Sequence, residues 1–204
     1  VLDGNEGVKE LPGIGFCENG KKVINPVSTV ISDVEKQIQP DYDLLDLNPY
    51  LRQEVHLGTS TSSSIKVAPM LTSYGCPYRC TFCATRTISG RSVAYRPLKE
   101  VFEEIDYFCE RYGVDEILFY DDNLLLMRKR MVEICNAFIE NRWPGLTWKT
   151  GGLMAYLLDD ELLEIMAEAG CKEIRISVES GSERVSKELV KKPIVLDDIP
   201  GIVS

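Results

Sequence analysis

Histidine is almost absent from this sequence, which contains only one, His56, among 204 residues. This scarcity argues against catalytic triads with a histidine base and against zinc sites that need several histidines. Positively charged residues are also few: the chain has 23 Lys and Arg residues and 32 Asp and Glu residues, which gives a net charge of −9. We therefore expect no nucleic-acid partner, since phosphate binding requires clustered Lys and Arg.

Two further absences concern membranes and export. No window reaches the apolar length of a membrane span, and the first residues have neither the basic nor the apolar region of a signal peptide. The seven cysteines are an odd number, and four of them are scattered along the chain. Without an export signal, this usage predicts a cytoplasmic protein with reduced thiols rather than a disulfide framework.

Hydrophobic residues make up 44% of the chain, which is enough for a packed core. From residue 65 onward, short apolar strands alternate with amphipathic helices. The predicted strands are residues 67–72, 116–120, 146–150 and 173–178, and the predicted helices begin at Pro97, near Met127, after Asp159 and after Ser182. Such alternation predicts an α/β fold in which parallel strands are joined by right-handed crossovers.

The first 65 residues have a different character and are predicted to form an irregular linker or appendage, with the core domain at residues 66–204. Asn19 and Gly20 stand between two short apolar runs and predict a β-hairpin. Residues 59–64 consist only of Ser and Thr and predict a solvent-facing loop, and His56 is expected to be a loop residue.

Polar clusters follow three of the four predicted strands. A group of cysteines follows the first strand, the Asp-Asp-Asn run at residues 121–123 follows the second, and Glu179 and Ser180 follow the fourth. Because ligands of parallel sheets lie at the carboxyl ends of the strands, these clusters predict one binding site. Plainer alternatives stay open, namely a solvated turn for residues 121–123 and an ion pair of Glu179 with Arg175 or Arg184.

Residues 73–83 carry three cysteines, Cys76, Cys80 and Cys83, spaced C-x3-C-x2-C. Thiolates this close in sequence favour a soft metal, and three of them suit a 4Fe–4S cluster with one iron left for a non-protein ligand. Zinc is the alternative metal, although structural zinc takes four protein ligands. A redox pair of Cys80 and Cys83 is a further alternative that leaves Cys76 without a role.

Residues 73–84 resemble the cluster-binding signature of radical S-adenosylmethionine (radical SAM) enzymes, including the aromatic Phe82 before the third cysteine. The resemblance continues to about residue 195, in blocks at residues 95–97, 103–105, 111–113, 119–123, 160–163, 169–171 and 177–184. It implies a partial TIM-like (β/α)6 barrel, of which this chain holds about four β/α units. It also implies truncation at both ends, and the open sheet edge of a half-barrel predicts poor stability or activity of the isolated chain.

The family resemblance also implies the cofactors and the site. Cys76, Cys80 and Cys83 would bind a 4Fe–4S cluster whose open iron takes S-adenosylmethionine (SAM). Reductive cleavage of SAM would give a 5′-deoxyadenosyl radical for hydrogen abstraction or methyl transfer. The further residues expected at the cosubstrate are Phe82, Asp121, Asp122, Asn123, Glu179 and Ser180. The implied partners are an unknown small-molecule substrate and an electron donor such as flavodoxin or ferredoxin.

Within the family, residues 121–123 and 179–184 are similar to enzymes that carry a cobalamin-binding domain before the barrel, and residues 11–45 resemble the linker between those domains. This implies cobalamin for the parent protein, through a domain outside this chain. Methylthiotransferases, which share the cysteine triad, are the alternative subgroup, and a non-catalytic module held by a metal or cluster is the alternative class. One departure is the Met-Ala-Tyr run at residues 154–156, where relatives often have Arg-x-Asp.

Overall fold

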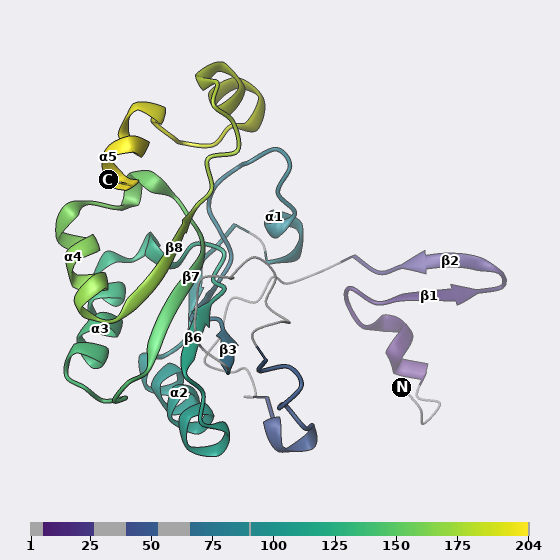
Figure 1. Cartoon of the computed structure of the whole chain (residues 1–204). Helices are drawn as coiled ribbons and strands as arrows, with labels where there is room; N and C mark the ends of the chain where they lie inside the picture. Colours follow the sequence, from purple (N-terminus) through teal and green to yellow (C-terminus); the bar gives the residue numbers. More distant parts are fainter. Residues whose placement is uncertain (1–5, 27–39, 53–65, 90, 204) are drawn as a thin grey trace.

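The computed structural model describes residues 6–26, 40–52, 66–89 and 91–203. The predicted Ser/Thr loop at residues 59–64 and His56 lie outside the described residues. Within the described ranges, a four-stranded parallel sheet forms the centre of the molecule, and helices and connecting loops are arranged around it (Figure 1).

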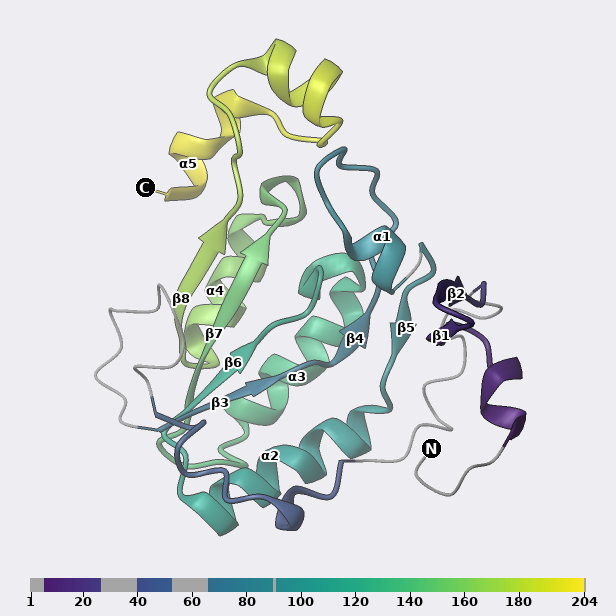
Figure 2. The same cartoon turned by 90° about the vertical axis from the view of Figure 1, so that its right-hand side faces the viewer.

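The central sheet consists of β3 (Val67–Met70), β6 (Glu116–Phe119), β7 (Thr147–Leu153) and β8 (Cys171–Ile176). All pairings are parallel, in the order β3-β6-β7-β8, so each strand lies beside the next one along the chain (Figure 2). This confirms the predicted α/β alternation and brings the carboxyl ends of the strands to one edge. The boundaries differ from the prediction, because β7 continues past Thr150 and β8 begins at Cys171 rather than Glu173.

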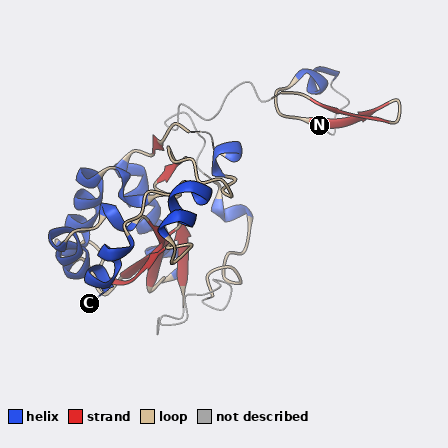
Figure 3. Ribbon diagram, turned by 90° about the horizontal axis from the view of Figure 1, so that it is seen from above, coloured by secondary structure: helices blue, strands red, loops and turns tan. Residues whose placement is uncertain are grey.

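Three helices, α2 (Leu98–Tyr112), α3 (Arg128–Ile139) and α4 (Asp160–Glu168), cover one face of the sheet (Figures 1 and 3). Their ends follow local chemistry. Gly113 closes α2 in the left-handed conformation, at a φ of 58°, where a residue without Cβ meets no clash. Asp159 begins α4 as predicted, because its carboxylate accepts the Leu162 N–H at 2.8 Å.

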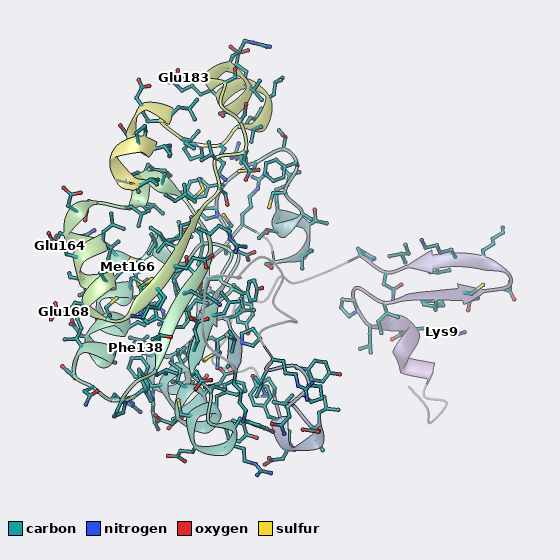
Figure 4. The ribbon with its side chains drawn as sticks, in the orientation of Figure 1. Lys9, Phe138, Glu164, Met166, Glu168 and Glu183 are labelled. Carbon is teal, nitrogen blue, oxygen red and sulfur yellow. The ribbon has the colours of Figure 1, made fainter. Side chains whose placement is uncertain are left out.

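The hydrophobic core lies between these helices and the sheet. Trp148 of β7 is fully buried, lies with its ring centroid 6.1 Å from that of Phe138, and donates its indole N–H to the Ala169 carbonyl at 2.9 Å. Figure 4 shows the polarity of α4, where Met166 points to the sheet and Glu168 points away from it. Across the described ranges, no helix combines the length and the apolarity that a membrane crossing requires.

Shorter elements surround the sheet. The predicted hairpin is present as β1 (Gly15–Glu18) and β2 (Lys21–Ile24), with Asn19 and Gly20 both at positive φ, as a two-residue turn of type I′ requires. The helix predicted after Ser182 is a π-helix, η7 (Val185–Val190). The remaining short helices are η1 (Glu6–Glu10), η3 (Tyr42–Leu44), α1 (Thr85–Ile88), η5 (Leu124–Leu126), η6 (Ala155–Leu157), η8 (Leu196–Asp198) and α5 (Ile199–Val203).

Residues 40–52 pack against the core domain at α2. The Tyr42 ring lies 5.1 Å from that of Phe108, between centroids, and its hydroxyl donates to the Glu104 carboxylate. Leu51 is buried, and its carbonyl accepts the N–H of Val67 at 2.7 Å. This segment of the predicted appendage is therefore attached to the first strand and first long helix of the core.

Candidate functional site

The three cysteines lie on a loop that leaves the sheet after β3. An antiparallel ribbon that the sequence analysis did not predict, β4 (Ser73–Tyr74) with β5 (Ala94–Tyr95), closes the base of this loop. The Cys83 N–H donates to the Cys80 carbonyl at 3.1 Å, and α1 begins directly afterwards. Cys76 and Cys80 are half-buried, whereas Cys83 is exposed. The loop therefore holds the three thiols within one locally closed segment.

The Asp121 carboxylate binds the residues at which this loop begins. It is 5% exposed and accepts the Thr72 N–H at 3.0 Å, the Thr72 hydroxyl at 2.7 Å and the Ser73 hydroxyl at 2.5 Å. Burial raises the pKa of Asp121, although these hydrogen bonds act in the opposite direction. The carboxylate thus fixes the end of β3, and its predicted contact with a cosubstrate competes with three donors already in place.

Asp122 joins the two ends of the cysteine loop. Its carboxylate accepts the Gly75 N–H at 2.9 Å, just before Cys76, and the Thr85 hydroxyl at 3.0 Å, just after the last cysteine. Gly75 has a φ of 90°, and a Cβ at this position would lie 2.2 Å from the Ser92 carbonyl oxygen. Only glycine fits this close approach of backbone to backbone.

Asn123 and Phe82 have opposite environments. Asn123 is 1% exposed, and neither its amide oxygen nor its amide nitrogen has a hydrogen-bond partner within the described part of the chain. Such a group is costly unless a water or a ligand satisfies it. Phe82, by contrast, is 61% exposed on the cysteine loop. The loop that carries the thiols therefore also carries an exposed apolar ring.

Glu179 and Ser180 follow β8, as predicted, but their partners differ from those considered. Glu179 pairs with Lys192 at 2.9 Å, and not with either arginine proposed from the sequence. Arg175 pairs instead with a glutamate on its own strand. The Ser180 hydroxyl accepts the Ser182 N–H at 3.1 Å and so stabilises the turn that leads to η7.

The last residues of η7 contact the cysteine loop directly. Thr81, which lies between the second and third cysteines, donates its N–H to the Val190 carbonyl at 3.0 Å and its hydroxyl to the Leu189 carbonyl at 2.8 Å. The second of these bonds joins residues 108 positions apart. Lys192 reaches the site through this contact, and no local sequence pattern indicated it.

Tyr156 is a second residue that the sequence analysis did not place in the site. It belongs to η6, after β7, and its ring lies edge-on to that of Tyr78 with centroids 6.1 Å apart. Burial raises the pKa of Tyr156, and the nearby Cys76 thiol adds to the rise. The Met-Ala-Tyr run that departs from the family pattern therefore contributes an aromatic side chain beside the first cysteine.

The thiols of the loop interact electrostatically with one another and with their charged neighbours. Burial raises the pKa of the Cys76 thiol to about 11, and the charges of Asp122, Cys80 and Cys83 add to the rise. Burial likewise raises the pKa of Cys80, whereas the Lys192 ammonium lowers it. Mutual repulsion of this kind favours binding of a cationic group that neutralises the thiolates.

The donor set fits a multi-iron group. A single zinc ion needs all its sulfur ligands at about 2.3 Å. An iron–sulfur cluster instead takes one thiolate on each of several irons. Three thiols on one loop, one for each of three irons, fit the second arrangement.

Comparison with known proteins identifies the family. The profile of the Radical SAM superfamily matches residues 70–198, a range that covers more than half of the chain and includes the whole cysteine loop. The chain belongs to the radical SAM superfamily. Enzymes of this superfamily use a 4Fe–4S cluster and SAM, so the predicted family and its cofactors are confirmed.

Two curated relatives are methyltransferases. Cytidylyl-2-hydroxyethylphosphonate methyltransferase of Streptomyces wedmorensis is 32% identical over 202 residues, which are 96% of this chain and 37% of that protein. Bacteriochlorophyllide d C-12(1)-methyltransferase of Chlorobaculum tepidum is 29% identical over 141 residues, which are 68% of this chain and 30% of that protein. The radical SAM chain described here thus spans only about a third of the length of these relatives, 37% of the first and 30% of the second.

The radical SAM methyltransferase TsrM from Kitasatospora setae has a similar fold. Its TM-score is 0.60 at 19% identity, over 67% of this chain and 27% of TsrM. A structure of TsrM contains cobalamin and a 4Fe–4S cluster. The likeness to TsrM shows the fold. The curated methyltransferases are the relatives expected for the predicted subgroup, and they confirm that resemblance.

Proposed function

We propose that this chain is the cluster- and SAM-binding part of a radical SAM enzyme in which Cys76, Cys80 and Cys83 hold the 4Fe–4S cluster. The observation that carries the proposal is the gathering of these three thiols on one loop at the carboxyl edge of a parallel sheet. Three thiolates would bind three irons and leave the fourth for the amino and carboxylate groups of SAM. When bound and reduced, the cluster supplies the electron that splits SAM into methionine and a 5′-deoxyadenosyl radical.

The chain's own residues would orient SAM and exclude water around it. Asp122 keeps the loop closed through Gly75 and Thr85. Phe82 would cover the adenine, since its ring is exposed beside the thiols, and the two unsatisfied amide atoms of Asn123 would bond to SAM directly or through water. Contacts of Asp121, Asp122, Glu179 and Ser180 with SAM complete the proposed site.

The proposed reaction is methyl transfer, or hydrogen abstraction, on a small-molecule substrate. Both relatives described above are methyltransferases, which favours the first. The electron would come from a small redox protein such as flavodoxin or ferredoxin. None of the seven cysteines is in a disulfide, which suits a reducing, cytoplasmic compartment. Cobalamin, if the parent protein binds it, would come from a domain preceding residues 1–65, which would act as the linker.

Residues 66–204 would form four units of a (β/α)6 barrel. The order β3-β6-β7-β8 supports this, because a barrel sheet adds each new strand beside the previous one. The remaining units would continue from β8, whose outer edge has no partner strand among the described residues.

Anaerobic reconstitution with iron and sulfide tests the proposal. The protein should turn brown, bind about four irons, and convert SAM to 5′-deoxyadenosine when dithionite is added. Cys80→Ala should lose all three properties, whereas Cys17→Ala, which removes an exposed cysteine on the hairpin, should keep them. A colourless protein that binds zinc through the same cysteines would refute the enzyme assignment and support a structural metal module.

A further inference from the structure

Lys192 is a buried lysine next to the cysteine loop. It is 6% exposed, and its ammonium pairs with the Glu179 carboxylate at 2.9 Å. Removing a lysine charge from water is unfavourable unless nearby negative groups compensate it. Glu179 supplies one such group but is itself partly exposed, with 32% of its side chain accessible. The buried Lys192 ammonium would therefore be stabilised by further negative charge nearby.

The backbone places Lys192 firmly against the loop. The residues just before it accept the N–H and hydroxyl of Thr81, between Cys80 and Cys83, as described above. The Lys192 N–H donates to the Ser186 carbonyl at 3.0 Å, which ties the lysine back to η7. Two hydrogen bonds to the loop and one to the helix thus hold the backbone at Lys192 against the cysteine loop.

Both sides of the ion pair involve an unfavourable backbone conformation. Glu179 has a φ of 66°, and Lys191, directly before Lys192, has a φ of 58°. The other non-glycine residues at positive φ in the described ranges are Asn19 and Asn141, and asparagine adopts this region more readily than Glu or Lys. Such strain persists where the surrounding structure imposes it, and it is common at functional sites.

We propose that the Lys192 ammonium compensates the negative charge of the three cysteine thiolates and thereby raises the reduction potential of the cluster, with Glu179 opposing it. The inference rests on the proposed function, because it requires the cluster to be held by this loop. Reduction adds one electron, taken from an external donor, to a site that already carries three thiolate charges. A neighbouring cation favours that step and a neighbouring anion disfavours it.

The test is a redox titration of the reconstituted protein with dithionite, without SAM, in which electron paramagnetic resonance measures the reduced cluster. At a fixed potential, Lys192→Gln should lower the ratio of reduced to oxidised cluster about tenfold, equivalent to about 59 mV for a one-electron couple. Glu179→Gln should shift the ratio in the opposite direction. Lys192→Arg should retain the wild-type value, because the charge is kept.

Lys191→Gln is the matched control, since it removes the same charge from the exposed neighbouring position and should leave the ratio nearly unchanged. Equal ratios for wild type and Lys192→Gln, in proteins with the same iron content, would overturn the inference while leaving the proposed function intact. Shifts of the same sign for Lys192→Gln and Glu179→Gln would also overturn it, because a merely structural ion pair predicts that result. A wild-type protein that takes up no iron would refute the proposed function and this inference with it.

Discussion

The ion pair between Lys149 of β7 and Glu116 of β6 should respond strongly to the loss of one partner. The two side chains are 1% and 0% exposed, and they connect adjacent strands of the sheet that carries the site. Replacing Lys149 by Met leaves the Glu116 carboxylate buried without its lysine. Loss of one partner of a buried pair typically costs about 3–5 kcal/mol. For a domain of this size, that corresponds to a fall in Tm of roughly 10 °C.

Urea unfolding followed by circular dichroism measures this cost as a change in the free energy of unfolding. The exposed pair of Lys187 and Glu183, whose side chains are 57% and 52% exposed, provides the control. Lys187→Met should change the free energy of unfolding by less than about 0.5 kcal/mol, because solvent screens such pairs. The contrast between the two variants isolates the effect of burial.

The double variant Lys149→Met, Glu116→Leu completes the design. Replacing both charges by apolar groups of similar size is often neutral or stabilising, so the double variant should recover most of the stability lost in Lys149→Met. A Lys149→Met protein as stable as wild type would refute the reasoning. A double variant less stable than Lys149→Met would refute it as well, since the cost would then not arise from an uncompensated charge.

Two further predictions concern iron binding by the cysteine loop and the stability of the fold at low pH. The Gly75→Ala variant should lose most of the iron that the wild type takes up on reconstitution, because the added Cβ would overlap a backbone carbonyl. The control Gly181→Ala, whose added Cβ meets nothing within 4 Å, should keep the iron. Full iron content in Gly75→Ala would contradict this prediction. Burial raises the pKa of Asp106, but hydrogen bonds from Arg142 and Trp143, both 2.7 Å, lower it overall. Because the folded pKa lies below the usual 3.8, Asp106 stabilises the fold above that pH and this contribution is lost as the pH falls through the lowered pKa. In Asp106→Asn, the urea midpoint of unfolding should therefore decrease less than in the wild type as the pH is lowered. An unchanged dependence of the midpoint on pH would contradict the prediction.

Much of the fold could be predicted because its determinants are local. The turn at Asn19 and Gly20 requires positive φ at two adjacent residues, and Asp159 caps the helix that begins immediately after it. Alternation of apolar strands and amphipathic helices was enough to predict parallel pairing. The β4–β5 ribbon was not predicted, because two-residue strands carry no periodicity that distinguishes them from a loop.

The sequence by itself determined the family and the cysteine loop, since three thiols within eight residues lie close together in any compact conformation of that segment. The tertiary structure decided how the neighbouring residues are used. It directs Asp121 inward to the end of β3, assigns Asp122 to the closure of the loop, and pairs Glu179 with Lys192 instead of an arginine. These partners depend on contacts between distant segments, which arise only when the strands are assembled and which no local pattern encodes.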